Sequence, residues 1–379
     1  MVEKKWIWQH KDYPNFKFNK DILLEALTNL ATSRGKLEGI LMLLGSKNIS
    51  FLGANSTVEE IVTSFQIEGE IINKESVKSS ILKKVDKLNM QKDYSTKQSD
   101  GLVEMFLDCS TNFEPLSIDR LNGWHNTLFP TGYSGLHKIN VATFRKEDIS
   151  VVSYKSGKEQ THYIAPPPKL LKSQIDEFLN YVNNSNENVY IKAAIAHFWF
   201  LTIHPFDDGN GRIARAITNY ILAKESNLQS KYYSISMAIS KDKKSYYDIL
   251  ESSQSLFLNK DLDLTKWILW HTNMIKNAIE HSLSEVEKVV QKAKFWERAR
   301  EFSLNSRQIK VLNKILDYGV DEFEGGINIK KYISITKTST ATAKRDIADL
   351  VNKKLISKVE GSAGRNTRYR LNFSKSEDK

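Results

Sequence analysis

The chain has little of what disulfide-bonded, membrane-spanning or exported proteins require. It holds one cysteine, Cys109, among 379 residues, which excludes an internal disulfide framework and a cysteine-rich metal site and favours a reducing compartment. Its most apolar stretch, residues 193–203, is far shorter than the roughly 20 residues that span a bilayer, and it contains His197. No apolar run of the signal-peptide type follows the N-terminal lysines. We therefore expect a cytoplasmic protein with no membrane segment.

Several common catalytic signatures are also missing. The sequence contains no Walker loop, no His-Glu-x-x-His zinc helix and no serine elbow. What it does have is an excess of positive charge, with a formal net charge of +10 and a pI of about 9.2. This charge favours polyanionic partners, whether nucleotides, nucleic acid or an acidic protein. The length and the 40% hydrophobic content predict two or three domains.

The N-terminal part is predicted to be helical. Leucine and isoleucine recur at helical spacing from residue 19 to residue 44, and Arg34 and Gly35 divide them into two sets, which predicts two packed helices or one interrupted helix. Ser56 and Glu59 fit a capping box and predict a short helix from Ser56 to about Gly69. The aromatic residues before residue 19 predict an arm that packs on the body.

The middle of the chain combines helices with one β-hairpin. Between residues 139 and 164, β-branched and aromatic residues flank a polar middle that contains Gly157, which predicts a hairpin. Apolar residues at helical spacing then predict helices over residues 170–182 and 191–200. We expect a mainly α fold.

The C-terminal part has the profile of a winged helix-turn-helix domain. Three predicted helices, over residues 306–316, 327–335 and 340–350, precede two short strands within residues 355–373. Basic residues near the third helix and the strands would suit contacts with DNA phosphates. They are Lys344, Arg345, Lys358, Arg365, Arg368 and Arg370.

The segment from His204 to Arg215 concentrates the chemistry. It reads His-Pro-Phe-Asp-Asp-Gly-Asn-Gly-Arg-Ile-Ala-Arg. Gly209, Gly211 and a left-handed Asn210 would let successive N–H groups converge on an anion at the start of a helix. Arg212 and Arg215 add positive charge one turn apart. The pattern predicts a phosphate cradle.

Two further side chains in this segment have the chemistry for group transfer. Asp208 is placed to hold Mg²⁺ on the same phosphates, because hard oxygen ligands suit that ion. His204 can accept a proton from an attacking hydroxyl near neutral pH. His197, in contrast, is expected to be a core residue.

The segment resembles the signature of the Fic family, His-x-Phe-x-Asp/Glu-Gly-Asn-Gly-Arg-x-x-Arg, and matches it at every defined position. The resemblance implies a Fic-type helical core with a β-hairpin flap that transfers AMP from ATP to a Ser, Thr or Tyr hydroxyl of a protein, with Mg²⁺. It implies that His204 is the base, Asp208 the metal ligand and Arg215 the clamp on the outer phosphates. The nucleotide-binding residues expected are Glu68, Thr161, His162, Tyr163, Asp208, Gly209, Asn210, Gly211, Arg212, Arg215, Tyr246 and Gln254.

Further resemblances extend the match beyond the signature. Residues 64–69 resemble the inhibitory helix motif Ser/Thr-x-x-x-Glu-Gly/Asn, which implies regulation by Ser64, Glu68 and Gly69. Glu68 would pair with Arg215 and could also orient a water that removes AMP from a modified protein. Residues 246–250 resemble the segment that packs on adenine, although a tyrosine pair on a helix is more often part of a core.

We therefore expect an N-terminal helical region over residues 1–100, a catalytic core over 101–298 and a winged helix domain with a charged tail over 299–379. The expected partners are ATP, a target protein that could be the chain itself, a second copy of the chain in a homodimer, and DNA bound by the C-terminal domain. One alternative is a DNA-binding regulator with a nucleotide-sensing core. Another keeps the fold but transfers a different group or uses a different donor.

Overall fold

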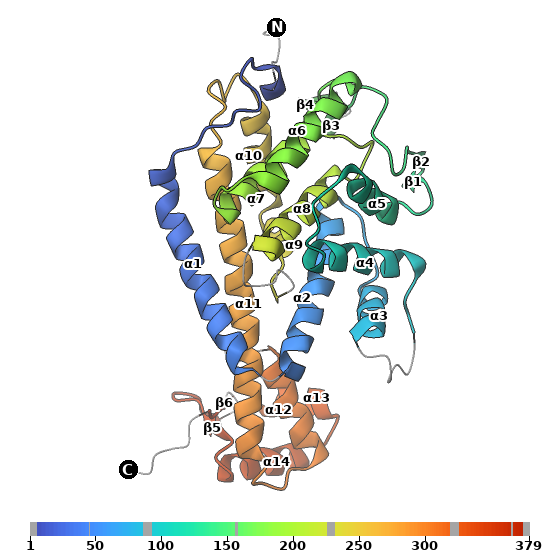
Figure 1. The fold of residues 1–379 in the computed structure, drawn as a ribbon. Coiled ribbons are helices and arrows are strands. Elements are labelled where there is room, and N and C mark those ends of the chain that lie inside the picture. The colour runs from blue at the N-terminus through green and yellow to red at the C-terminus, as the bar shows by residue number, and fades with distance from the viewer. Residues whose placement is uncertain are drawn as a thin grey trace. The chain divides into compact units, whose positions relative to one another are not determined.

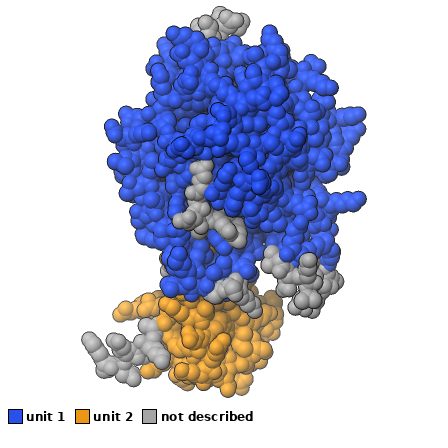
Figure 2. Space-filling model, viewed as in Figure 1, with its two compact units in different colours: residues 1–282 blue, residues 283–379 orange. Residues whose placement is uncertain are grey.

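The computed structural model describes residues 6–44, 46–85, 93–155, 158–225, 232–318, 326–364 and 367–373. The chain divides into two compact units, Met1–Ser282 and Leu283–Lys379, which Figure 2 colours separately. The boundary falls within helix α11 (Thr265–Ala299), whereas the sequence places it at the end of that helix. Most described residues are helical, as predicted, and no helix in the described ranges has the length and apolarity to span a membrane.

The first long helix is continuous. After the short helix η1 (Ile7–Gln9), α1 runs from Lys20 to Leu43 and is capped by Asn19, whose side chain accepts a hydrogen bond from the backbone N–H of Asp21 at 3.0 Å. The prediction of two helices or an interrupted one is therefore wrong. Leu23, Leu30 and Leu37 are fully buried at a spacing of seven, so one stripe continues past Gly35. Burial of that stripe outweighs the cost of the two helical glycines, Gly35 and Gly39, roughly 1 kcal/mol each.

Helix α2 (Ser46–Ile67) begins ten residues before the predicted start at Ser56. Ser56 lies inside the helix, and the neighbouring Thr57 hydroxyl donates to the carbonyl of Gly53 one turn earlier at 2.8 Å. The capping pattern at Ser56 therefore predicted the wrong helix start. Ser and Thr inside a helix can instead donate to a carbonyl of the preceding turn. The C-terminal end is close to the prediction, since Gly69 has a φ of +82°, the left-handed conformation that ends many helices.

The remaining helices of unit 1 surround a buried pair. Helix α7 (Val189–Ile203), apolar on all sides, packs against α8 (Asn210–Glu225), and α6 (Leu171–Asn184) packs on α7 (Figure 1). Helix α4 (Lys97–Thr111) also packs on α8, and α2 packs on α9 (Ile235–Lys241). These helices hold the turn between α7 and α8 in place. The other helices of the unit are α3 (Lys74–Val85), α5 (Ile118–Leu128), η2 (Pro168–Leu170) and α10 (Lys243–Gln254).

The predicted hairpin is shorter than expected. Strands β3 (Ser150–Lys155) and β4 (Lys158–Ile164) pair antiparallel, with a bulge between Val151 and Val152. Residues 139–149, predicted as part of the first strand, form a loop instead, which is tied to the α7–α8 turn because the backbone N–H of Arg145 donates to the carbonyl of Pro205. The hairpin turn at 156–157 lies outside the described residues. A second small hairpin, β1 (Tyr133–Ser134) with β2 (His137–Lys138), was not predicted.

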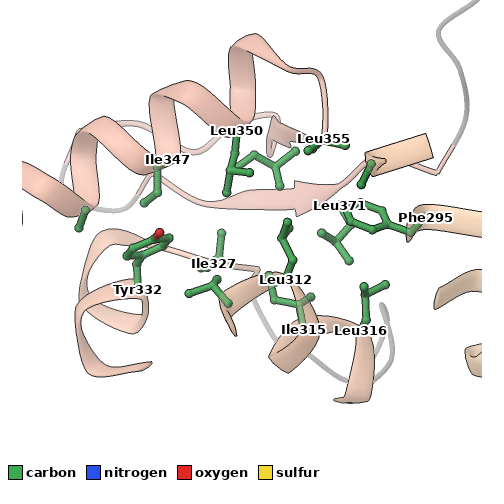
Figure 3. Packing of buried hydrophobic residues seen from close by; sticks show 14 residues of the cluster. Phe295, Leu312, Ile315, Leu316, Ile327, Tyr332, Ile347, Leu350, Leu355 and Leu371 are labelled. Carbon is green, nitrogen blue, oxygen red and sulfur yellow. The ribbon is translucent and has the colours of Figure 1, made fainter. Parts of the chain in front are cut away.

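Unit 2 has a core of its own. Helices α12 (Ser306–Tyr318), α13 (Ile329–Thr336) and α14 (Thr340–Asn352) precede the antiparallel strands β5 (Ile356–Lys358) and β6 (Tyr369–Leu371). Ile327, before α13, forms a bridge to Tyr369. Figure 3 shows side chains from the helices and strands, among them Leu312, Leu350 and Leu371, meeting in one apolar cluster. The predicted element order is present, and Arg365 lies outside the described residues.

Candidate active site

The turn between α7 and α8 is held by unusual backbone conformations. His204 ends α7 with φ 52° and ψ 58°, and Gly209 has a φ of +79°. A left-handed histidine is uncommon, and such conformations concentrate at functional sites. Asn210, predicted to be left-handed, is instead the first residue of α8. Its side chain accepts from the N–H of Phe206 at 3.0 Å and donates to the carbonyl of Phe206 at 2.8 Å. The side chain is therefore occupied in closing the turn, and only the backbone N–H remains for an anion.

His204 is oriented as an acceptor. Its Nδ1 lies 3.2 Å from the carbonyl oxygen of Leu201, so Nδ1 carries the proton that is donated there. Nε2 is then unprotonated and meets no hydrogen-bond partner among the described residues. The pKa of His204 is lowered to about 4, mainly by burial and also by the nearby Arg145, while the hydrogen bond to the carbonyl of Leu201 and the charges of Asp208 and Glu68 oppose the shift. The ring is thus neutral at neutral pH.

Arg145 is a site residue that sequence reasoning missed. Its side chain is almost fully buried, and Nε donates to the carbonyl of His204 at 2.8 Å. Nη1 donates to the carbonyl of Glu147 at 2.9 Å, and Nη2 donates to Pro166. These bonds fix the strained end of α7. No motif marks such a residue, because its partners are main-chain carbonyls from separate segments.

Arg215 is held by the end of α2. Its Nη2 donates to Glu68 Oε1 at 2.8 Å and to the carbonyl of Ser64 at 2.9 Å, while Nε donates to Ser64 Oγ at 2.9 Å. The arginine is 2% exposed, and the side chain of Glu68 is 27% exposed. Ser64, Glu68 and Arg215 therefore lie together as the sequence predicted. A Cβ on Gly211 would lie 2.3 Å from Glu68 Oε1, so the carboxylate has room only because that position is glycine.

Arg212 has a carboxylate partner that the sequence did not reveal. Its Nη1 lies 2.9 Å from Glu70 Oε1 and 3.0 Å from Oε2. The guanidinium also sits between the rings of Phe65 and Phe129, at 4.9 and 4.8 Å from their centroids. Both arginines keep unused donors. Among the described residues, Arg212 Nε and Nη2 and Arg215 Nη1 are buried and make no hydrogen bond, which suits an anion with several oxygens.

Helix α2 is anchored to α8 and α9 by Glu60, two turns before Glu68. This carboxylate is 3% exposed and accepts from Asn219 Nδ2 at 3.1 Å, from Ser234 Oγ at 2.8 Å and from the N–H of Ser236 at 2.9 Å. Glu60 and Ser64 are four residues apart on one face of α2, and Glu68, one residue past the end of the helix, continues the same spacing. The face that meets α8 and α9 thus carries both the anchor and the arginine partner.

Asp208 is suited to hold a cation only together with a ligand. One of its oxygens, Oδ1, accepts from the N–H of Gly209 at 2.5 Å and lies 3.5 Å from Arg212 Nη2, while Oδ2 accepts from the Ser134 hydroxyl. In the described part of the chain, no cluster of three or more His, Cys, Asp or Glu could form a metal cage. Mg²⁺ commonly takes one or two carboxylates and completes its shell with phosphate oxygens and water. The partly exposed Asp208 fits that use.

A cavity of about 470 Å³ opens in front of His204. Its walls come from the end of α2, the β3–β4 hairpin, the α7–α8 region and α10. The lining residues are Glu68, Val151, Val152, Ser153, His162, Tyr163, Leu201, His204, Gly211, Tyr246, Tyr247, Asp248, Leu250, Glu251 and Gln254. Of the residues expected to bind nucleotide, Thr161, Asp208, Gly209, Asn210, Arg212 and Arg215 are not in its lining.

Tyr246 and Tyr247 both line the cavity but differ in exposure. Tyr246 is 2% exposed, and its hydroxyl lies 3.1 Å from Nε2 of His197, a core histidine whose Nδ1 meets Thr218 Oγ1 at 3.0 Å. Tyr246 therefore belongs largely to the core, although it lines the cavity. Tyr247, which the sequence did not favour, is 39% exposed at the same wall. Gln254 reaches Thr202 Oγ1 at 3.3 Å.

The hairpin is joined to α10 across the cavity. His162 Nδ1 lies 2.7 Å from Glu251 Oε2, and its Nε2 lies 2.6 Å from Ser153 Oγ. Tyr163, next to it, is buried and donates its hydroxyl to the carbonyl of Thr202 at 2.5 Å, and burial raises its pKa. Sequence reasoning named His162 and Tyr163 but missed Ser153 and Glu251.

Comparison with known proteins gives two family matches. Residues 115–222 match the Fic/DOC family, and residues 6–86 match a domain of unknown function, DUF4172. Among curated relatives, a uridine 5'-monophosphate transferase of Xanthomonas campestris pv. campestris is 27% identical over 118 residues, 29% of this chain and 21% of that protein. A probable protein adenylyltransferase of Aquifex aeolicus is 25% identical over 180 residues, 45% of this chain and 51% of that protein. The chain thus spans about half or less of these relatives.

Solved structures extend the fold comparison to most of the chain. A Fic family protein from Desulfovibrio desulfuricans G20 superposes with a TM-score of 0.51 and 17% identity, covering 93% of this chain and 97% of that one. At this identity the likeness concerns the fold. It agrees with the Fic-type helical core and hairpin expected from the sequence.

Proposed function

Because the chain belongs to the Fic/DOC family through residues 115–222, we propose that it transfers AMP from ATP to a Ser, Thr or Tyr hydroxyl of a protein. The observation that carries the proposal is a cavity lined both by His204, whose Nε2 is unprotonated, and by Gly211, the second residue of α8. A base beside the positive end of a helix is what nucleotidyl transfer to a hydroxyl needs.

The reaction uses these groups in sequence. The phosphates of ATP bind at the start of α8, where backbone N–H groups and the unused nitrogens of Arg212 and Arg215 offer donors. The target hydroxyl attacks the α-phosphorus as its proton passes to His204 Nε2. An O–P bond forms to the target, and the bond to the leaving pyrophosphate breaks. Asp208 would hold Mg²⁺, which neutralises phosphate charge when bound.

The β3–β4 hairpin is the proposed support for the target segment. In the described residues it forms a sheet of two strands, so each strand has an edge that pairs with no other strand. An extended target segment can add to such an edge through main-chain hydrogen bonds and bring its hydroxyl into line. The target can be another protein or the chain itself, in the same molecule or in a homodimer partner.

Glu68 is the proposed inhibitor. Its carboxylate occupies Arg215 Nη2, a donor that an outer phosphate of ATP would otherwise use. The bound arginine leaves ATP room in the cavity but not the clamp that aligns its α-phosphorus. The same carboxylate could orient a water to remove AMP from a modified protein.

The test is incubation of the full chain and its Glu68→Gly variant with ATP labelled at either the α or the γ phosphate, followed by intact-protein mass measurement. Transfer of the α label with a mass gain of one AMP supports the proposal. Transfer of the γ label alone would mean that ATP binds reversed and phosphate is transferred.

We also propose a separate role for unit 2, binding of double-stranded DNA. The exposed face of α14 presents Lys344 and Arg345 between the small residues Ala341 and Ala348, which permits a close approach to a groove. Lys358 and Arg370 are exposed on the following strands, and Arg368 is exposed just before β6. Mutation of both Lys344 and Arg345 to Ala should flatten the slope of log affinity against log salt by about two. Lys310→Ala on α12 is the matched control, and an unchanged slope in the double variant would exclude this surface.

A further inference from the structure

One wall of the cavity is formed by one face of α10. Tyr247, Glu251 and Gln254 follow at intervals of four and three, so they lie on one side of the helix, and all three line the cavity. The phosphate end is at His204 and Gly211, on the wall from α7 and α8. A nucleotide with its phosphates there has α10 and the hairpin to receive its base.

Glu251 stands in the middle of that wall and is held in one orientation. His162 donates its Nδ1–H to Glu251 Oε2 at 2.7 Å, and the Ser153 hydroxyl fixes the other ring nitrogen at 2.6 Å. The side chain of Glu251 is 37% exposed and that of His162 is 28% exposed. One carboxylate oxygen is therefore engaged by the hairpin, while the side chain as a whole still faces the cavity.

A carboxylate oxygen accepts hydrogen bonds and cannot donate them. It attracts an exocyclic amino group, such as that of adenine, and repels a carbonyl oxygen at the same place, such as O4 of uracil. A site built to satisfy a polar group of the substrate discriminates strongly against an analogue that lacks the complementary group. The two curated relatives named above carry names for different nucleotides, so the base selected by this chain has to come from its own residues.

We propose that Glu251, positioned by His162, selects the donor nucleotide by accepting a hydrogen bond from the exocyclic amino group of its base, so that ATP is taken and UTP is rejected. The inference rests on the proposed nucleotidyl transfer. It adds the residue that reads the base. The imidazole acts through Glu251 and is a positioning residue.

The experiment measures the affinity of the full chain for ATP and for UTP by titration calorimetry. The wild type should bind ATP at least about tenfold more tightly than UTP, and Glu251→Gln, which can donate as well as accept, should reduce that ratio about tenfold. Asp248→Asn is the matched control, because Asp248 lines the same wall of α10 but pairs with Lys244. It should leave the ratio within about twofold.

A second variant separates base reading from misfolding. His162→Ala keeps the carboxylate but frees it, and the ATP-to-UTP ratio should fall in the same direction while the melting temperature stays near that of the wild type. Equal affinity of the wild type for both nucleotides, or a ratio that Glu251→Gln leaves unchanged, would overturn the inference.

Transfer assays with α-labelled ATP and UTP distinguish this outcome from failure of the proposed function. Transfer with a ratio indifferent to Glu251 would refute base reading and keep the function. In the Glu68→Gly background, an ATP-to-UTP binding ratio that depends on Glu251, without transfer to any protein, would support base reading and refute the proposed function.

Discussion

The two halves of the site are in different states. On the histidine side, Nδ1 is fixed by Leu201, and Nε2 has no partner among the described residues and faces a cavity. On the arginine side, Arg215 and Arg212 are each held by a carboxylate of the chain, Glu68 and Glu70. In the proposed mechanism the proton acceptor is thus ready, while the phosphate clamp is occupied. Control in that mechanism would act on how the nucleotide lies and not on the proposed base.

The largest effect is expected from removing the histidine side of the site. His204→Ala should lower α-label transfer by about 10²–10⁴-fold, because the target hydroxyl loses its proton acceptor. The affinity for ATP should change by less than about threefold, since the ring acts on the hydroxyl and not on the phosphates. Transfer rates and calorimetric ATP titrations on the same preparation measure both.

Equal transfer by His204→Ala and the wild type would remove this residue from the mechanism. Loss of ATP affinity in step with transfer would instead make it a binding residue.

Releasing Arg215 from Glu68 should raise transfer activity instead of lowering it. Glu68→Gly removes the carboxylate from Arg215, so self-modification should rise at least about tenfold, as expected for a charged hydrogen-bonded pair worth roughly 1.5–3 kcal/mol. Arg215→Ala should be inactive alone and together with Glu68→Gly, because the clamp itself is then missing.

Gln66→Gly is the matched control for Glu68→Gly. Gln66 is exposed in the same last turn of α2 and carries no carboxylate, so its replacement loosens the helix end without freeing Arg215. A comparable rise in this control would assign the effect to helix loosening, and no rise in Glu68→Gly would exclude Glu68 as the inhibitor.

The second ion pair should matter less. Glu70 is 43% exposed, and solvent screens its attraction to Arg212, so Glu70→Gln should increase ATP affinity by about two- to fivefold. The gain is expected because Glu70 and the phosphates of ATP compete for Arg212. Calorimetry at low salt would detect this gain, and high salt would reduce it. A decrease in affinity would mean that Glu70 orients Arg212 for the nucleotide.

Most residues of the site could be predicted from the sequence, but the partner of Arg212 could not. His204, Asp208 and both arginines stand within twelve consecutive residues, and the helix spacing of Ser64 and Glu68 predicts that they share a face. Their contact with Arg215 agrees with that expectation. Glu70 follows the helix in a turn, where no periodicity says which way a side chain points, so its pairing with Arg212 could not be read.

Other features depended on tertiary packing. Asn210 fits a left-handed turn by residue type, but the open backbone groups of Phe206 take its side chain, and helix α8 begins there. Arg145 and Glu251 are single charged residues whose partners come from distant segments. Local patterns predict the elements well and these long-range bonds poorly.

The smallest expected effect concerns pH and tests the ready state of His204. Burial lowers the pKa of His204 to about 4, so the neutral base persists as the pH falls below the usual histidine value. With Glu68→Gly as the active background, kcat/KM for ATP should change by less than about twofold between pH 7.5 and 5.5. A base titrating at about 6.5 would lose roughly tenfold over this interval.

The pH range must stop where folding is lost. Burial also lowers the pKa of His125 to about 4 and of His271 to about 3. The unfolded chain therefore binds more protons than the folded one below about pH 6.5, and stability falls as the pH drops from there toward the folded values. Melting curves at each pH define the usable range, and ATP affinity at each pH corrects for titration of the nucleotide. An acidic limb near 6.5 in the corrected kcat/KM, with the protein still folded, would mean that the free enzyme does not hold His204 neutral, and that the histidine half has to be prepared by its substrate.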